Sequence, residues 1–66
     1  MNQQPYFTTY IGRPFLEAGK EIKNNFGDKY KIQVLTYGSF ATCDYVTSRI
    51  RVYLDINNII ERINIG

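Results

Sequence analysis

A chain of 66 residues with a net charge of +2 forms one small domain, and a domain of this size buries only about 60% of its unfolded surface. One cysteine and no histidine exclude an internal disulfide and argue against a zinc site. The basic residues are spread from Arg13 to Arg62, and the small positive net charge is too weak to indicate a nucleic-acid or membrane partner. The core has to form by packing alone.

No targeting or membrane-spanning segment is recognisable in the sequence. Residues 1–5 have neither a charged n-region nor an apolar run, and no apolar stretch approaches the roughly 20 residues that span a bilayer. We therefore expect one soluble, monomeric domain over residues 1–66, with no cofactor. Folding without disulfides favours the cytoplasm or another reducing compartment, and a secreted mature form stays open.

The amino-terminal half predicts one amphipathic helix. Residues 1–6 are polar and expected to be flexible, and residues 7–11 are expected to form a short extended piece. Apolar side chains then recur at helical spacing, at Phe15, Ala18, Ile22 and Phe26. Pro14 suits the first helical position and Gly27 suits a left-handed cap. These signals place the helix at residues 14–26.

The carboxyl-terminal half predicts three strands and a long loop. Alternation of polar and apolar residues indicates strands at residues 31–37, 49–55 and 59–65, with a turn at residues 57–58 where asparagine tolerates positive φ. The expected fold is α+β, with the amphipathic helix packed on a small mixed sheet. Residues 39–48 form an exposed loop between two strands, and a loop of this length in a compact domain is usually functional.

Two arginines and an acidic residue mark this loop. Arg49 and Arg51 have strand spacing and should emerge from the same face of the sheet, where they could hold Asp44 of the loop above them. Such arginines are more often a solvated surface of little energetic value. A lone cysteine is often a buried apolar residue, but the polar neighbours of Cys43 favour an exposed thiol.

The sequence argues against an enzyme. A nucleophile needs a base, and the chain has no histidine. Arg49 or Arg51 could lower the pKa of the Cys43 thiol, but the adjacent Asp44 works against that. No phosphate-binding glycine loop, no paired carboxylates at useful spacing and no metal-binding motif is present. We therefore expect no catalytic residue and no metal ligand.

The motifs taken together resemble a known family over residues 7–66. They are Ile11-Gly12, Glu17-Ala18 with Ile22, Val34-Leu35, Thr42-Cys43-Asp44-Tyr45, Arg49-Ile50-Arg51-Val52, Asp55, Asn58-Ile59 and Ile65-Gly66. No single piece is specific, but the loop motif combined with the Arg-x-Arg strand and the final glycine is. In these motifs the chain resembles the potato type I serine protease inhibitors.

The resemblance implies a loop that enters a protease active site as a substrate would. The implied reactive bond is Cys43–Asp44, with Cys43 at P1, the residue on the amino side of that bond. The implied reactive-site loop consists of Ala41, Thr42, Cys43, Asp44, Tyr45 and Val46. The residues implied to brace it are Thr42, Asp44, Arg49, Arg51 and Gly66, the last through its carboxylate.

The side chain at P1 bears on the target. Cysteine is small and apolar, which suits a subtilisin-, chymotrypsin- or elastase-like serine protease, whereas a trypsin-like pocket would reject it for lack of positive charge. The alternative is a non-inhibitory interaction module on the same fold. A further alternative is regulation through the Cys43 thiol, whose oxidation could join two copies and block the loop.

Overall fold

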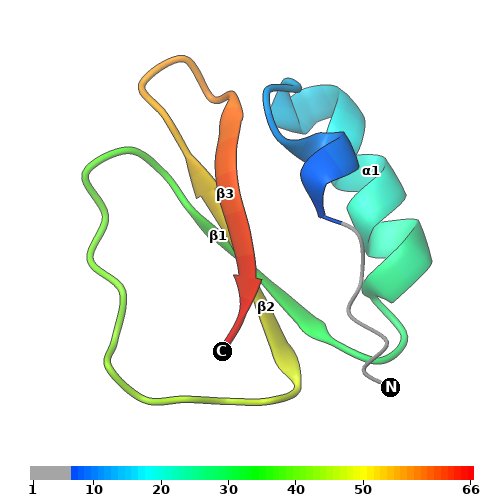
Figure 1. Ribbon diagram of the computed structural model, residues 1–66, viewed down its shortest axis with the longest axis vertical. Coiled ribbons are helices and arrows are strands. Elements are labelled where there is room, and N and C mark those ends of the chain that lie inside the picture. Colours follow the sequence, from blue (N-terminus) through cyan, green and yellow to red (C-terminus); the bar gives the residue numbers. More distant parts are fainter. Residues whose placement is uncertain (1–6) are drawn as a thin grey trace.

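The computed structural model describes residues 7–66, and it places one helix on one face of a three-stranded sheet (Figure 1). The elements in chain order are the 3-10 helix η1 (Thr8–Tyr10), the helix α1 (Phe15–Phe26) and the strands β1 (Lys31–Leu35), β2 (Arg49–Leu54) and β3 (Ile60–Ile65). The flexibility expected for residues 1–6 concerns a segment outside the described residues. Among the described residues, no helix is both long and apolar enough to cross a membrane.

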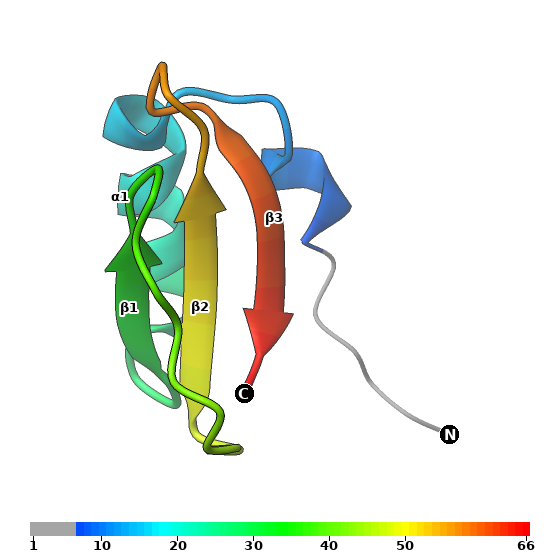
Figure 2. The same cartoon turned by 90° about the vertical axis from the view of Figure 1, so that its left-hand side faces the viewer.

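The sheet is mixed, so the predicted α+β class is confirmed. Its strand order is β1-β2-β3, with β1 parallel to β2 and β3 antiparallel to β2. Because β1 and β2 are neighbours and run the same way, the chain has to return along the whole sheet between them. Residues 36–48 make this return across the sheet face opposite α1 (Figure 2). The length and position of the loop follow from this topology.

The core lies between α1 and the inner face of the sheet. Ala18 and Ile22 of α1 meet Ile50 and Val52 of β2, and all four side chains are fully buried. The remaining buried members of the cluster are Tyr10, Leu54, Ile60 and Ile63. The helical stripe and the alternation of β2 were both readable in the sequence, and the structure joins the two faces that these patterns predicted.

The segment before α1 is not extended, which corrects the expectation for residues 7–11. Thr8–Tyr10 forms a turn of 3-10 helix, and this turn directs Tyr10 into the core, where it is 5% exposed. The Tyr10 ring lies edge-on to Phe26, and its hydroxyl accepts a hydrogen bond from Nδ2 of Asn25 at 2.9 Å. Contacts with the distant end of α1 therefore determine this local conformation.

Both ends of the helix differ slightly from the prediction. Pro14 is the N-cap residue and not part of α1, and its backbone forms an isolated bridge with Ile59. Gly27 follows the helix as predicted, but its φ of −63° is right-handed, so the expected left-handed cap is wrong. Its N–H instead continues the helical pattern by donating to Lys23 O at 2.8 Å, because the chain makes one further turn before β1.

The predicted first strand was two residues too long. It ends at Leu35 because residues 36–39 form a turn, in which Ser39 N–H donates to Thr36 O at 3.0 Å. Gly38 takes a φ of +84° in this turn, a conformation that favours glycine. The predicted turn between β2 and β3 contains the expected positive φ at an asparagine, since Asn58 has a φ of 61°.

Candidate functional site

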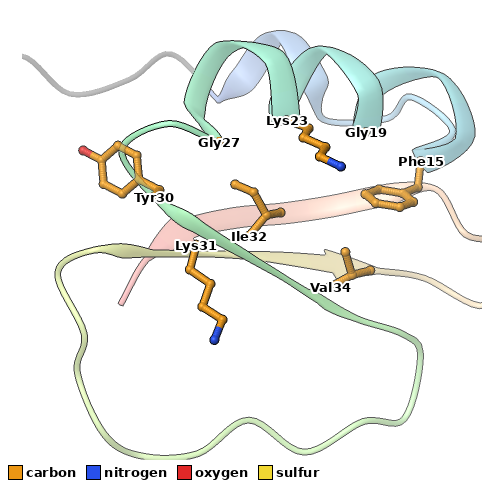
Figure 3. Close-up of a pocket in the computed structure, with 8 residues that line it drawn as sticks. All are labelled: Phe15, Gly19, Lys23, Gly27, Tyr30, Lys31, Ile32 and Val34. Atoms are coloured by element: carbon orange, nitrogen blue, oxygen red, sulfur yellow. The ribbon is translucent and has the colours of Figure 1, made fainter.

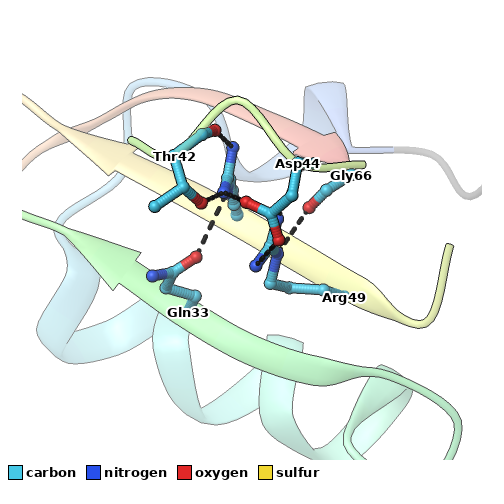
Figure 4. Close-up of polar contacts among 6 residues, drawn as sticks. Gln33, Thr42, Asp44, Arg49 and Gly66 are labelled. Atoms are coloured by element: carbon cyan, nitrogen blue, oxygen red, sulfur yellow. Dashed lines mark hydrogen bonds and ion pairs between the residues drawn. The ribbon is translucent and has the colours of Figure 1, made fainter. Parts of the chain in front are cut away.

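The candidate site is the loop over the outer face of the sheet, where two arginines of β2 rise to meet it (Figure 4). Arg49 and Arg51 are separated by one residue in β2, and both project from the same face of the strand, as strand alternation requires. The hydrophobic residue between them, Ile50, points the other way and is fully buried in the core. The packing of Ile50 therefore fixes the orientation of both guanidinium groups.

Arg51 holds the part of the loop that precedes Cys43. Its Nη1 donates to Thr42 O at 2.9 Å and its Nη2 donates to Thr42 Oγ1 at 2.6 Å. Its Nε donates to Oε1 of Gln33 at 3.1 Å. The residue is only 6% exposed, and a buried cation requires such partners because desolvation would otherwise be costly. Every nitrogen of the guanidinium is used.

Arg49 holds the part of the loop that follows Cys43. Its Nη2 donates to Asp44 O at 3.1 Å, and its Nη1 lies 3.4 Å from Asp44 Oδ2. Its Nε donates to the main-chain oxygen of Gly66 at 2.6 Å, which ties the end of β3 to the same cluster. Arg51 also reaches Asp44, with Nη2 at 3.6 Å from Oδ1. The two arginines thus hold the backbone on both sides of Cys43.

The Asp44 carboxylate is exposed, yet its pKa is shifted. The hydrogen bond from the Thr42 hydroxyl and the nearby Arg49 guanidinium hold the pKa of Asp44 below its usual value, against the opposing effect of desolvation. Both groups favour the ionised form. The carboxylate is therefore charged at neutral pH and available to both arginines.

The remaining predicted loop residues surround this cluster. The thiol of Cys43 is exposed and takes no part in the bracing contacts. Tyr45 is 73% exposed, and its ring lies so close to Gly66 that a Cβ there would be 3.2 Å from Cδ1 of Tyr45. Ala41 is exposed, and Val46 O accepts a hydrogen bond from Arg49 N–H at 3.2 Å.

Two residues near the loop were missing from the prediction. Gln33 accepts a hydrogen bond from Arg51, and it lies directly opposite Arg51 in the parallel register of β1 and β2. The sequence shows that Gln33 lies on a strand but not which residue it faces. Phe40 lies in the predicted loop, just before the predicted reactive-site residues, and is 98% exposed; this exposure could not be read from the sequence.

A groove lies on the helix side of the sheet, on the face opposite the loop. A groove of about 400 Å³ runs between α1 and β1, with Phe15 and Gly19 on one wall and Ile32 and Val34 on the other (Figure 3). None of the loop residues lines it. The groove is thus separate from the site that the arginines organise.

The fold and site define a class of protein in which a helix-backed sheet presents a loop held by internal contacts. Residues 10–63 match the family model described as the Potato inhibitor I family, and the chain belongs to that family. This confirms the resemblance seen in the sequence motifs. None of the curated proteins matches the sequence.

Two solved structures of protease inhibitors are similar to this chain. The bitter gourd trypsin inhibitor is 25% identical, with a TM-score of 0.73 over 88% of this chain and 85% of that one. The elastase inhibitor AFUEI is 28% identical, with a TM-score of 0.66 over 86% of this chain and 78% of that one. Family and neighbours indicate a protease inhibitor and not an enzyme.

Proposed function

We propose that this chain inhibits serine proteases by a substrate-like mechanism, in which loop 39–48 enters the active site and Cys43–Asp44 is the reactive bond. One observation carries the proposal. The main-chain carbonyls of Thr42 and Asp44, on either side of Cys43, are both held by arginines while the Cys43 side chain is left free. A loop arranged in this way presents its central residue without having to be ordered on binding.

The energetic consequence concerns both binding and cleavage. Ordering a flexible side chain at an interface costs about 0.5–1.5 kcal/mol, and a loop that is already held avoids much of that cost. After hydrolysis, Arg51 would retain the new end at Cys43 through Thr42, and Arg49 would retain the new end at Asp44. Because the ends cannot move apart, resealing of the bond competes with product release.

Cys43 also constrains the target. A small, uncharged P1 side chain fits the apolar or small pockets of subtilisin-, elastase- or chymotrypsin-like proteases. It offers no cation to a pocket that selects lysine or arginine, so this chain should differ in specificity from the trypsin inhibitor that it resembles in fold. An elastase-like target agrees better with the second structural neighbour.

The test is incubation of the protein with subtilisin, elastase and chymotrypsin, with residual activity and the mass of the inhibitor followed over time. We expect inhibition of at least one of these enzymes, with slow appearance of a single nick between Cys43 and Asp44. Rapid cleavage at many sites would identify an ordinary substrate. Failure to bind any of the three would favour a non-inhibitory interaction module on the same fold.

The exposed thiol supports one variant of this function. Because Cys43 is exposed at the position proposed to enter the protease, oxidation to a disulfide-linked dimer would block the loop. Inhibition measured with and without reductant tests this variant. A thiol-regulated inhibitor would lose activity on oxidation and recover it on reduction, whereas a Cys43→Ser variant would respond to neither treatment.

A further inference from the structure

Strand β1 is an edge of the sheet that no other described strand covers (Figure 2). It pairs with β2 along one side, and the Lys31 N–H points that way, donating to Ser48 O at 2.7 Å. Main-chain groups of successive residues point alternately to the two sides of a strand, so those of Ile32 and Val34 point away from β2. Their N–H and C=O groups form a template on which a further strand can pair.

This open edge borders the groove between α1 and β1 (Figure 3). A short edge strand is common and by itself needs no partner. Here, however, the side chains of Ile32 and Val34 point toward α1, the Phe15 ring lies above Val34, and Val34 is 38% exposed. A strand paired with β1 would bury its inward-facing side chains in this space of about 400 Å³. Apolar burial would then add to the main-chain hydrogen bonds.

Three lysines surround the same edge. Lys23 and Lys31 line the groove, and Lys20 lines a smaller groove that adjoins it along α1. No acidic residue lines either groove, and among residues 7–66 none of the three ammonium groups has a carboxylate partner. Unpaired cations around an apolar surface attract an occupant of opposite charge. The side chains complementary to this edge are therefore apolar and acidic.

A second copy of this chain does not meet that requirement. Pairing of two β1 strands would bring Lys31 of each copy to the lysines of the other, and β1 contains no acidic side chain to offset them. Such repulsion acts against a dimer, as lysines on edge strands commonly do. A partner with acidic side chains converts the same repulsion into attraction.

We propose that β1 and the groove beside it bind an extended segment of a partner protein, in which apolar and acidic side chains alternate. Its main chain pairs with Ile32 and Val34, its apolar side chains enter the groove, and its acidic side chains meet the lysines. The surface lies between α1 and β1, and no residue of the braced loop lines it. This second site goes beyond the proposed function, because the loop stays free to engage a protease.

The test titrates the isotope-labelled protein with three capped peptides, each long enough to pair with all five residues of β1. The peptides alternate valine with glutamate, valine with lysine, and serine with glutamate, and NMR follows amide resonances and amide hydrogen exchange. We expect the valine–glutamate peptide to bind saturably and to slow exchange of the Ile32 and Val34 amides by at least about tenfold. The other two peptides should bind at least about fivefold more weakly.

A charge reversal tests the role of the lysines. Lys23→Glu changes an exposed residue of α1 that lines the groove. Arg62→Glu makes the same change of charge on β3, where the guanidinium lies over the Tyr53 ring. We expect Lys23→Glu to weaken binding of the valine–glutamate peptide by about fivefold or more, and Arg62→Glu to stay within about twofold of the wild type. Equal weakening by both variants would overturn the inference, since net charge alone would explain the binding.

The exchange data distinguish strand addition from other kinds of binding. If the valine–glutamate peptide fails to bind, or binds without slowing exchange of the Ile32 and Val34 amides, no strand is added and the inference is wrong. Equal binding of the valine–lysine peptide would rule out the acidic partner. If the protein alone shows protection of these amides as its concentration rises, a second copy covers the edge and the inference is also wrong. Protease inhibition takes no part in these measurements, so their failure leaves the proposed function unaffected.

Discussion

Arg51 is a buried charge that is costly to desolvate, and its contacts order the loop. It is the buried charged residue among residues 7–66, and taking a cation out of water costs free energy that its hydrogen bonds have to offset. Two of its three partners, Thr42 and Asp44, lie on an exposed loop, where water can hydrate them once Arg51 is removed. The contacts therefore contribute more to the order of the loop than to the stability of the domain.

This distinction predicts the behaviour of Arg51→Ala. We expect inhibition of the target protease to weaken by about tenfold or more, because the loop would have to be ordered on binding. The free energy of unfolding should fall by only about 1 kcal/mol, since the freed loop groups can be hydrated. Inhibition constants and urea unfolding of the same preparation measure the two effects.

Arg62→Ala is the matched control for that experiment. It removes the same charge from the sheet, at a position where the guanidinium lies 4.1 Å above the Tyr53 ring and not against the loop. Its inhibition constant should stay within about twofold of the wild type. Equal weakening by both variants would mean that overall charge, not bracing of the loop, explains the effect of Arg51.

The shifted pKa of Asp44 predicts a dependence on pH. Its pKa is lowered in the folded protein mainly by the Thr42 hydrogen bond, then by a hydrogen bond from its own backbone and by Arg49, so the folded state binds fewer protons than the unfolded state as the carboxylate titrates. The resulting stabilisation is fully present above the ordinary carboxyl pKa of about 3.9 and is lost as the pH falls through the lowered folded value. Bracing by this residue should thus be constant near neutrality and disappear in acid.

Thermal unfolding of the wild type and Asp44→Asn across this range measures the effect. We expect the wild type to have the higher Tm from about pH 5 to 7, and the difference to shrink as the pH falls below about 4. The Asp44→Asn variant cannot ionise at this position but keeps every other carboxylate, so the difference in Tm between the two proteins isolates the contribution of Asp44. A Tm difference that stays constant down to pH 2 would contradict the assignment.

At the scale of elements, the helix and the loop lie on opposite faces of the same strand. Ile50 and Val52 of β2 pack on α1, while Arg49 and Arg51 on the other face hold the loop. The helix therefore supports the site indirectly, by fixing the strand from which the arginines project. Damage to this packing should lower stability without altering the chemistry of the loop.

Substitution in the helix tests the supporting role of α1. Ile22 is fully buried against the sheet, so Ile22→Ala should lower the free energy of unfolding by about 2–5 kcal/mol. Leu16, in the same helix but 84% exposed, should change it by less than about 0.5 kcal/mol when replaced by alanine. Chemical denaturation measures both. Similar losses for the two variants would contradict the packing described here.

At the scale of the whole molecule, the parallel pairing of β1 and β2 explains both the shape and the proposed durability of the inhibitor. The return connection has to cross the outer face of the sheet, which brings Thr42 and Asp44 above the arginines. The proposed reactive bond lies within that connection. Its cleavage would leave the strand pairing on both sides intact, so the two pieces would stay together in the folded sheet.

The sequence by itself determined the helical stripe, the alternation of β2 and the common face of Arg49 and Arg51. These features depend on the spacing of residues within one element, and spacing is readable without a structure. Local signals were less reliable where distant contacts compete with them. The 3-10 turn at Thr8–Tyr10 forms because Tyr10 packs against Phe26, and Gly27 is right-handed because the chain continues turning after α1.

Only the tertiary structure determined which residues of different segments lie next to one another. The partnership of Gln33 with Arg51 depends on the register between β1 and β2, and the full exposure of Phe40 depends on the path of the loop across the sheet. Neither register nor path is a property of a single segment. They follow from packing α1 against one face and from the return connection that a parallel pair requires, so they exist only once the whole chain is folded.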